Sequence, residues 1–476
     1  MEANQNQQQA GTQVQTTQTV PVTQVQIPAQ VSPAPVAVAE PVAPVATAPV
    51  VAAPVADPVV AVPAGPDKLK QLQDGILAAN IPQIVMITIS YALDLRTSDI
   101  HIEPLENNVR VRYRIDGVLR KIVEYPKNLH PAVVSRVKIM SNLKIDEQRL
   151  PQDGRADVTT RDGREMDLRI STLPTVNGEK IVMRIQDKSR KIPDLPDLGI
   201  SGISLKNLEA ALASPNGIII NTGPTGSGKT TTLYSCLMRL NKVDVNILTI
   251  EDPVEIQVNG LNQSQVHHDI DFDFAAGMRS ALRQDPDIIM VGEIRDKETG
   301  NTAIEASLTG HLVFSTLHTN SAVESIVRLV NMGIQPYLLT STIEVIIAQR
   351  LVRKLCEKCK KPAESNEEIL AMVKRAMDQL SVEGEVDKAL LDGLKFYEAV
   401  GCGDCNDVGY HGRLGLYEVF RMDNELRKLI GESASTLDIQ AAAQKNGMVT
   451  LEQAGIIKAL EGETSLEEVY RVARKS

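Results

Sequence analysis

The chain has 476 residues, a formal net charge of −10 at pH 7 and a pI of about 5.4, and its length allows two or three domains. The acidic balance, the absence of Trp and the 3% content of aromatic residues argue against a protein whose main partner is a nucleic acid. No apolar run reaches the roughly 18–20 residues that span a bilayer, and the N-terminus has no basic segment ahead of an apolar one, as a secretory signal would. These features favour a cytoplasmic protein.

Residues 1–66 differ in composition from the rest of the chain. They begin with a Gln/Thr-rich stretch and continue as a Pro/Val/Ala tract. Because proline recurs every few residues, helix and sheet are excluded and we expect a disordered, partly polyproline-like extension. Such a segment is either a passive tether or a docking segment that folds onto a partner.

Residues 67–192 have the pattern of a smaller α+β domain that is rich in antiparallel strands. A helix-like stretch, "IPQIVMITISYALDL", leads into segments that alternate with period two. Hairpins are expected at Asp116-Gly117 and at Asp162-Gly163, because Asp-Gly between alternating residues is a strong turn signal. Arg110, Arg112 and Arg114 share one face of the first hairpin, either as a solvated basic surface or as one that meets a phosphate or an acidic neighbour.

Residues 198–355 predict an α/β core. Four apolar runs, "NGIIINTG", "VNILTIEDP", "PDIIMVGE" and "HLVFSTLH", alternate with helical stretches, which is typical of a parallel sheet covered on both faces. The Pro- and Gly-containing segment "KIPDLPDLGI", near residues 190–200, is the expected hinge between the two domains. A cysteine-containing element (356–420) and a helical C-terminal region (421–476) follow.

The octapeptide "GPTGSGKT" lies between an apolar strand and a helix-like stretch, as a phosphate-binding P-loop requires. Its glycines let backbone N–H groups and the helix N-terminus approach phosphates closely. Lys229 is expected to reach the β- and γ-phosphate oxygens and Thr230 to offer its hydroxyl to Mg²⁺. Cys236, on the same helix, is expected to be a small buried residue. The expected nucleotide-binding residues are Gly223, Pro224, Thr225, Gly226, Ser227, Gly228, Lys229, Thr230 and Thr231.

Acidic residues end two of the apolar runs. "TIEDPVE" supplies Glu251, Asp252 and Glu255, and "DIIMVGE" supplies Glu293, where Gly292 stands in place of the aspartate common in ATPases. The carboxyl ends of parallel strands converge on one crevice, so both groups are expected beside the phosphates. Hydrolysis needs one carboxylate to organise water and another to hold the metal or its water shell.

Two histidines flank the fourth apolar run, in "TGHLVFSTLHTN". His311 and His318 are candidate catalytic residues on a strand that could sense the γ-phosphate, although a single histidine is more often structural. His267 and His268 are expected to form a loop pair.

Four of the five cysteines form two C-x-x-C pairs, Cys356/Cys359 and Cys402/Cys405. Four thiolates complete a tetrahedral shell that suits structural Zn²⁺ and leaves no open position for catalysis. The long spacing between the pairs requires a helical insert that projects from the site. Two redox-active pairs are the alternative, but two such pairs flanking a helical insert favour a structural metal.

Four motifs in order, "GPTGSGKTTTLY", "TIEDPVE", "LRQDPDIIMVGEIRD" and "TGHLVFSTLHTN", resemble those of the secretion ATPases that assemble type IV pili and drive type II secretion. The resemblance, over about residues 75–470, implies a hexameric ring in which a strand-rich, PAS-like domain precedes a RecA-like ATPase domain. It implies ATP hydrolysis in which Glu251 activates water and Glu293 lies on the metal side, or with these roles exchanged. It also implies that arginines of the strand-rich domain reach the nucleotide, and Arg155 and Arg169 are the candidates.

The resemblance also narrows the system that the chain serves. Pilus-extension and type II secretion ATPases usually carry the tetracysteine element, which the shorter retraction motors lack, and the retraction motif "AIRNLIRE" is absent. We therefore expect a homohexameric motor that is peripheral at the cytoplasmic face of an inner membrane, binds no nucleic acid and drives an integral-membrane platform protein during pilus assembly. Type II secretion, DNA uptake and a non-hydrolysing scaffold are the alternatives. Many relatives carry a folded docking domain where this chain has residues 1–66.

Overall fold

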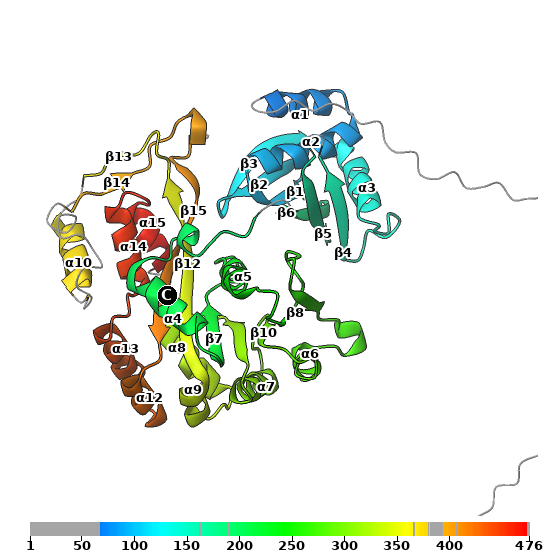
Figure 1. Ribbon diagram of the computed structural model, residues 1–476. Coiled ribbons are helices and arrows are strands. Elements are labelled where there is room, and N and C mark those ends of the chain that lie inside the picture. Colours follow the sequence, from blue (N-terminus) through cyan, green and yellow to red (C-terminus); the bar gives the residue numbers. More distant parts are fainter. Residues whose placement is uncertain are drawn as a thin grey trace, which may run out of the picture. The chain divides into compact units, whose positions relative to one another are not determined.

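The computed structural model describes residues 67–160, 163–187, 191–364, 367–378, 380, 394–405 and 407–473 (Figure 1). The expected extension (1–66), Asp162 of the second hairpin and the later part of the insert between the cysteine pairs lie outside these residues. Among the helices of the described ranges, none combines the length and the apolar character needed to cross a bilayer.

An antiparallel sheet forms the core of the N-terminal part. Its strands have the spatial order β3-β2-β1-β6-β5-β4, and side chains of α1, α2 and α3 pack with one face of it into a single apolar cluster. This arrangement confirms the expected α+β character. The elements are α1 (Asp67–Leu77), α2 (Ile81–Asp94), β1 (Thr97–Pro104), β2 (Asn108–Ile115), β3 (Val118–Pro126), the 3₁₀ turn η1 (Lys127–Leu129), α3 (His130–Met140), β4 (Gln152–Thr159), β5 (Glu165–Thr175) and β6 (Gly178–Asp187).

The strand pairs of both expected hairpins are present. β2 pairs with β3 around Asp116 and Gly117, whose φ angles of 46° and 85° are the positive values that a tight two-residue turn demands. β4 and β5 pair antiparallel from Gln152 opposite Thr172 to Thr159 opposite Glu165.

The arginines of β2 meet acidic neighbours within their own sheet. Glu103 on β1 accepts from Arg110 at 3.0 Å and from Arg112 at 2.7 Å, and Arg114 lies 3.4 Å from Asp99. Burial of the Glu103 carboxyl opposes its ionisation, but hydrogen bonds from these arginines and from Lys180 prevail and lower its pKa to about 2. Of the two expectations for this face, the structure shows the acidic neighbour.

A mixed seven-stranded sheet forms the second core, with the order β15-β12-β7-β11-β10-β8-β9. The four predicted apolar runs are its neighbouring parallel strands β7, β11, β10 and β8, as expected. The elements up to the first cysteine are η2 (Pro196–Leu198), α4 (Gly202–Leu212), β7 (Gly217–Thr222), α5 (Lys229–Leu240), β8 (Ile247–Glu251), β9 (Asn262–Gln265), η3 (His268–Ile270), α6 (Phe274–Ala281), β10 (Ile288–Val291), α7 (Lys297–Leu308), β11 (Leu312–Leu317), α8 (Ala322–Asn331), α9 (Pro336–Thr342) and β12 (Ile343–Leu355).

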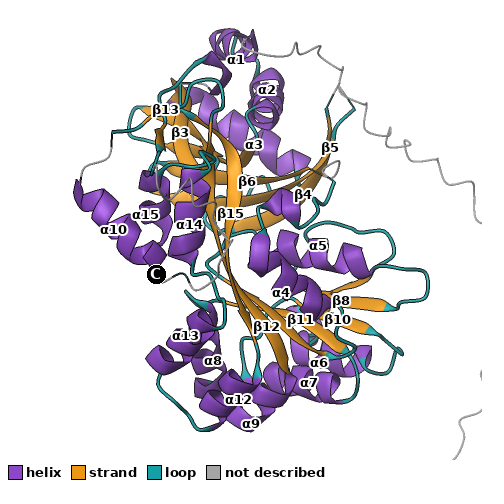
Figure 2. Cartoon of the chain, turned by 60° about the vertical axis from the view of Figure 1, so that its left-hand side comes forward, coloured by secondary structure: helices purple, strands orange, loops and turns teal. Residues whose placement is uncertain are grey.

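Helices cover both faces of this sheet (Figure 2). α4 and α5 pack on one face, and α6, α7, α8 and α9 pack on the other. Each face of the sheet has its own apolar cluster. Every residue of β7, β10 and β11 is buried, which explains why these strands read as continuous apolar runs rather than as alternating ones.

The C-terminal part differs from expectation in one respect. Residues 410–421, which we placed mostly with the cysteine element (356–420), form β15, an antiparallel partner of β12 in the large sheet. Residues 414–420 are all buried, including Glu418, so this segment packs as a strand of the large sheet. The remaining elements are β13 (Lys361–Pro362), α10 (Glu367–Asp378), β14 (Tyr397–Glu398), η4 (Gly403–Cys405), β15 (Tyr410–Arg421), α12 (Asn424–Gly431), α13 (Thr436–Lys445), α14 (Leu451–Leu460) and α15 (Leu466–Ala473).

A buried ion pair generates a stability prediction for the N-terminal domain. Lys138 on α3 lies 2.6 Å from Glu179, with both side chains at most 6% exposed, and also donates to the carbonyl of Glu147 at 2.7 Å. Replacing Lys138 by Met leaves a buried carboxylate without its counter-charge, so we expect the free energy of unfolding to fall by about 3–5 kcal/mol. Urea denaturation of the purified protein measures the change.

The matched control is Lys121→Met, which removes a pair with Glu124 whose lysine is 61% exposed. It should cost less than about 1 kcal/mol. Equal effects of the two variants would contradict the assigned role of Lys138.

Candidate active site

The phosphate-binding loop connects β7 to α5 and is shaped by glycine. Gly223, Gly226 and Gly228 have φ angles of 149°, 79° and 90°, a region that other residues rarely adopt. A Cβ at Gly223 would lie 2.5 Å from the carbonyl oxygen of Gln349, and one at Gly228 would lie 2.9 Å from the Gln349 amide nitrogen. The strand–loop–helix context predicted for this motif is therefore confirmed.

Lys229, the first residue of α5, folds back onto the loop. Its ammonium donates to the carbonyl oxygens of Gly223 at 2.8 Å and Pro224 at 3.3 Å. Burial lowers the pKa of Lys229 to about 8, against the opposing effect of the Glu293 carboxylate. The buried hydroxyl of Ser227 has no hydrogen-bond partner in the described chain. A phosphate oxygen would satisfy the Ser227 hydroxyl, since a buried donor without an acceptor is costly.

Glu251, at the end of β8, is held by three donors. Its carboxylate accepts from Tyr234 at 2.5 Å, from Thr249 at 2.6 Å and from Gln263 at 3.1 Å. Burial raises the pKa of Glu251 although these hydrogen bonds work in the opposite direction. A carboxylate has about four acceptor positions, so one remains for a water molecule.

Glu293 follows β10 and is the more accessible of the two carboxylates. It forms an ion pair with Arg295, and its other oxygen lies 3.2 Å from Nε2 of His318, which follows β11. Lys229 comes after β7, so Lys229, Glu293 and His318 all follow the carboxyl ends of neighbouring strands.

The glycine that replaces the usual aspartate has a packing reason. A Cβ at Gly292 would lie 3.1 Å from the ring of Phe274 and 3.4 Å from the carbonyl oxygen of Ile250. A side chain at this position would therefore require the ring of Phe274, on α6, to shift.

The other two acidic residues of "TIEDPVE", Asp252 and Glu255, contact different partners. Asp252 lies 3.3 Å from Nε2 of His268, which was expected to be only a loop residue. Glu255 lies 3.1 Å from Arg169, whose guanidinium also donates to the carbonyl of Val254 at 3.0 Å. Arg155 is exposed and stands opposite Arg169 in the β4–β5 register.

His311 is not brought to the phosphate loop. It precedes β11, whereas His318 follows that strand, and six strand residues span about 20 Å. Its Nδ1 lies 2.8 Å from the carbonyl oxygen of Ala306 and 3.1 Å from the hydroxyl of Thr309, at the end of α7. These contacts are those of a structural histidine.

Sequence reasoning did not identify Tyr234, Gln263 or Arg295 as site residues. Tyr234 lies within a motif that we quoted, five residues after Lys229, but nothing local indicates that it faces Glu251. Gln263 reaches Glu251 only because β9 pairs with β8, which the sequence pattern did not show.

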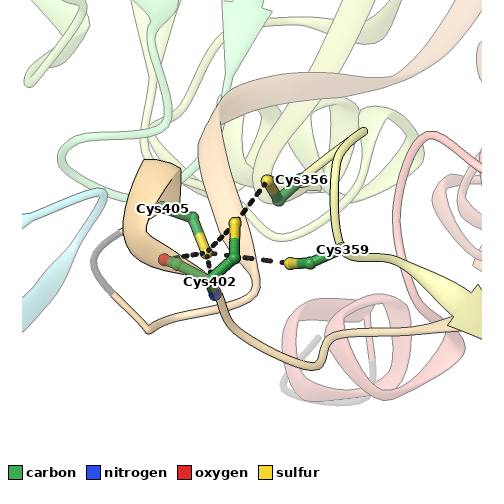
Figure 3. Close-up of side chains that lie close together, drawn as sticks. All are labelled: Cys356, Cys359, Cys402 and Cys405. Carbon is green, nitrogen blue, oxygen red and sulfur yellow. Dashed lines mark hydrogen bonds between the residues drawn. The ribbon is translucent and has the colours of Figure 1, made fainter.

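The four paired cysteines converge on one point (Figure 3). Three Sγ–Sγ separations are 3.7–3.8 Å, and all four sulfur atoms lie within 4.8 Å of one another. A tetrahedral Zn²⁺ with Zn–S bonds of about 2.3 Å requires sulfur atoms about 3.8 Å apart, whereas a disulfide requires about 2.05 Å. The donor set therefore fits a four-thiolate metal site.

Backbone N–H groups support this cysteine cluster. Gly409 and Cys402 donate to the sulfur of Cys405 at 3.1 and 3.2 Å, and Gly401 donates to Cys359 at 3.4 Å. Such donors stabilise thiolates, the form in which cysteine binds metals. Cys236 lies apart from the cluster and is fully buried, as expected.

A P-loop on a parallel sheet, with carboxylates at the ends of adjacent strands, defines an ATPase of the α/β class. The family described as "Type II/IV secretion system protein" matches residues 76–471. The chain belongs to this family, and it is an ATPase.

Curated relatives come from both branches of the family. The type IV pilus assembly ATPase PilB of Myxococcus xanthus is 48% identical over 82% of this chain and 67% of its own length. The type II secretion system protein E of Pseudomonas aeruginosa is 45% identical over 87% of this chain and 78% of its own length. The two identities are too close to separate the branches.

Solved structures share the fold. The Legionella pneumophila ATPase DotB superposes with a TM-score of 0.58 at 22% identity and covers 81% of this chain and 94% of its own. The pilus retraction motor PilT with bound ADP superposes with a TM-score of 0.52 at 26% identity, with coverages of 81% and 96%.

The lowered pKa of Lys229 generates a prediction for ATP affinity. The free protein loses the Lys229 proton as pH rises through about 8, whereas bound phosphates keep the lysine protonated. The Kd for ATP should therefore be nearly constant below pH 8 and rise by up to about tenfold per pH unit above it. Titration with a fluorescent ATP analogue from pH 7 to 9.5 measures this profile.

Lys229→Arg is the control, because a guanidinium stays protonated over this range. Its affinity is expected to be weaker but independent of pH. A flat profile for the unmodified protein would contradict the burial argument.

Proposed function

We propose that the chain is a homohexameric motor, peripheral at the cytoplasmic face of an inner membrane, that hydrolyses ATP to power type IV pilus assembly. The observation that carries the choice of an assembly or export motor is the tetracysteine cluster, which the retraction motors of the resembling family lack. The 48% identity to a pilus assembly ATPase supports assembly. The 45% identity to a type II secretion ATPase keeps secretion as the second candidate.

The residues of the site divide the work of hydrolysis. Backbone N–H groups of Gly223 and of residues 225–231 bind the phosphates, and Lys229 neutralises their β- and γ-oxygens. Glu251, with its raised pKa and one unoccupied acceptor position, orients and deprotonates the attacking water. Thr230 and Glu293 are the residues that would hold Mg²⁺, which supplies charge neutralisation when bound.

Two further groups act around the γ-phosphate. Nε2 of His318 lies 3.2 Å from the Glu293 carboxylate and so links the loop after β11 to the charge of that carboxylate. Arg155 and Arg169, on adjacent strands of the N-terminal sheet, are proposed to add positive charge to the transition state. Arg169 already contacts the segment that follows Glu251.

The segment between the two sheets is anchored to the helix of the phosphate loop. The hydroxyl of Ser235 on α5 donates to the carbonyl of Pro193 at 2.7 Å, and Arg239 forms an ion pair with Asp194 at 2.7 Å. Movement of α5 on hydrolysis would therefore be passed to this segment, which we propose as the hinge that drives a membrane platform protein.

We propose that the cysteine cluster holds structural Zn²⁺. A preformed four-thiolate shell fits this ion, and no position remains open for a substrate. The purified protein should contain about one zinc per chain by elemental analysis. Replacing both Cys402 and Cys405 by Ser should remove the metal and lower the thermal midpoint, since metal affinity contributes to folding.

Cys236→Ser is the control, because this buried thiol lies outside the cluster. It should leave the zinc content unchanged. A protein with clearly less than one zinc per chain, or one whose zinc survives the double substitution, would refute the metal assignment.

The cellular role is tested by deleting the gene and restoring it with the unmodified or the Lys229→Ala chain. We expect loss of pili in electron micrographs, recovery with the unmodified chain only, and unchanged secretion of folded proteins. The unmodified protein should sediment as a hexamer with ATP. Intact pili together with lost secretion would favour the second candidate, and a monomer under all conditions would contradict the ring.

A further inference from the structure

A group of buried polar side chains lies beneath the phosphate loop and has no part in the chemistry described above. It comprises Asn221 on β7, Thr232 on α5, Gln349 on β12 and Tyr417 on β15, each at most 3% exposed. We call it the Gln349 cluster. Polar groups in the middle of an otherwise apolar sheet are costly unless they are hydrogen-bonded, so their presence calls for a reason.

Gln349 is the centre of this cluster. Its carbonyl oxygen accepts from Asn221 at 3.0 Å and from Thr232 at 2.9 Å, and its amide nitrogen donates to the hydroxyl of Tyr417 at 3.2 Å. Asn221 also donates to the carbonyl of Lys229 at 3.3 Å. The other three side chains therefore come from three different elements, and each of them is hydrogen-bonded to Gln349.

The phosphate loop rests directly on Gln349. The space beside Gly228 is filled by its side-chain amide, and the space beside Gly223 is filled by its backbone carbonyl. Two glycines that shape the loop thus contact the same residue of β12. Loss of the amide would remove the support of the loop and leave Asn221 and Thr232 without their shared acceptor.

The next residue, Arg350, reaches the other loop of the site. Its guanidinium donates to the carbonyl of Gln349 at 3.1 Å and to that of Asn320 at 2.8 Å. Arg350 is 5% exposed. Asn320 lies two residues after His318, the partner of Glu293. Gln349 therefore contacts the phosphate loop, and Arg350 contacts the loop that carries His318 while its guanidinium also lies beside Gly223.

We propose that Gln349 and Arg350 are positioning residues of the ATPase site: Gln349 sets the phosphate-binding conformation of the P-loop, and Arg350 sets the loop that presents His318 to Glu293. Neither touches the reacting atoms. The inference rests on the assignment of the P-loop and of His318 under the proposed function. It predicts that the two residues affect different kinetic constants.

The main test compares Gln349→Met with Gln453→Met. Gln453 on α14 is equally buried and donates to the carbonyl of Ala376 at 3.0 Å, far along the chain from the loop. Both variants should have a lower thermal midpoint. Only Gln349→Met should raise the KM and the Kd for ATP, by about tenfold, with a smaller change in kcat.

Arg350→Met should instead lower kcat more than it changes the KM for ATP. We expect kcat to fall by about tenfold or more while the KM for ATP changes little, and Arg350→Lys to recover part of the rate because one donor to Asn320 can remain. Tyr417→Phe removes a single partner of Gln349 and should raise the KM less than Gln349→Met does. It replaces Gln349→Met in the test if that variant does not fold.

The outcomes separate the inference from the function on which it rests. If Gln349→Met and Tyr417→Phe lose stability as Gln453→Met does, but keep the KM and kcat of the unmodified protein, Gln349 is merely structural and the proposal fails. If Arg350→Met raises the KM and leaves kcat unchanged, the assignment to the His318 loop fails. If Lys229→Ala hydrolyses ATP normally, the P-loop assignment itself is wrong.

Discussion

The parallel pairing of β12 with β7 is the constraint on which the rest of the ATPase core depends. β7 ends at the phosphate loop, and β12 passes beneath that loop before it reaches the first cysteine. The register places Asn221 opposite Ile347 and Thr222 opposite Ala348, so Gln349 and Arg350 emerge where the loop begins. A one-residue slip would exchange the two faces of the strand and turn Gln349 away from the loop.

Two buried glutamates link the large sheet to the helices around it. Glu418 on β15 is directly opposite Ala348, and its two carboxylate oxygens accept from the backbone N–H groups of Ala322 and Leu451, at the starts of α8 and α14. A carboxylate at a helix N-terminus satisfies donors that have no partner within the helix. Nearer the cysteines, Glu468 on α15 forms ion pairs with Arg353 of β12 and with Arg471 of its own helix. β12 thus contacts the nucleotide loops and leads to the cysteine cluster, while its antiparallel partner β15 holds the starts of α8 and α14.

Sequence reasoning succeeded where the chemistry is local. The P-loop, the carboxylates and the cysteine pairs are short motifs, and the strands that hold them are continuous apolar runs. It did not identify β12 and β15 as strands of the large sheet, in which Arg350 and Glu418 are buried. It also could not separate His311 from His318, which share a motif and lie at opposite ends of β11. Only the direction of the strand, which the fold provides, shows that His318 is the one beside Glu293.

The central claim is that this site hydrolyses ATP with two carboxylates that share the work. Glu251 is buried and hydrogen-bonded by Tyr234, Thr249 and Gln263, and Glu293 is more accessible and lies beside His318. The most direct test is steady-state ATP turnover by the purified protein, beside Glu251→Gln and Glu293→Gln. We predict turnover by the unmodified protein and a loss of about 100-fold or more in each variant with ATP binding retained. Binding of ATP without turnover by the unmodified protein, or full activity of either variant, would contradict the account.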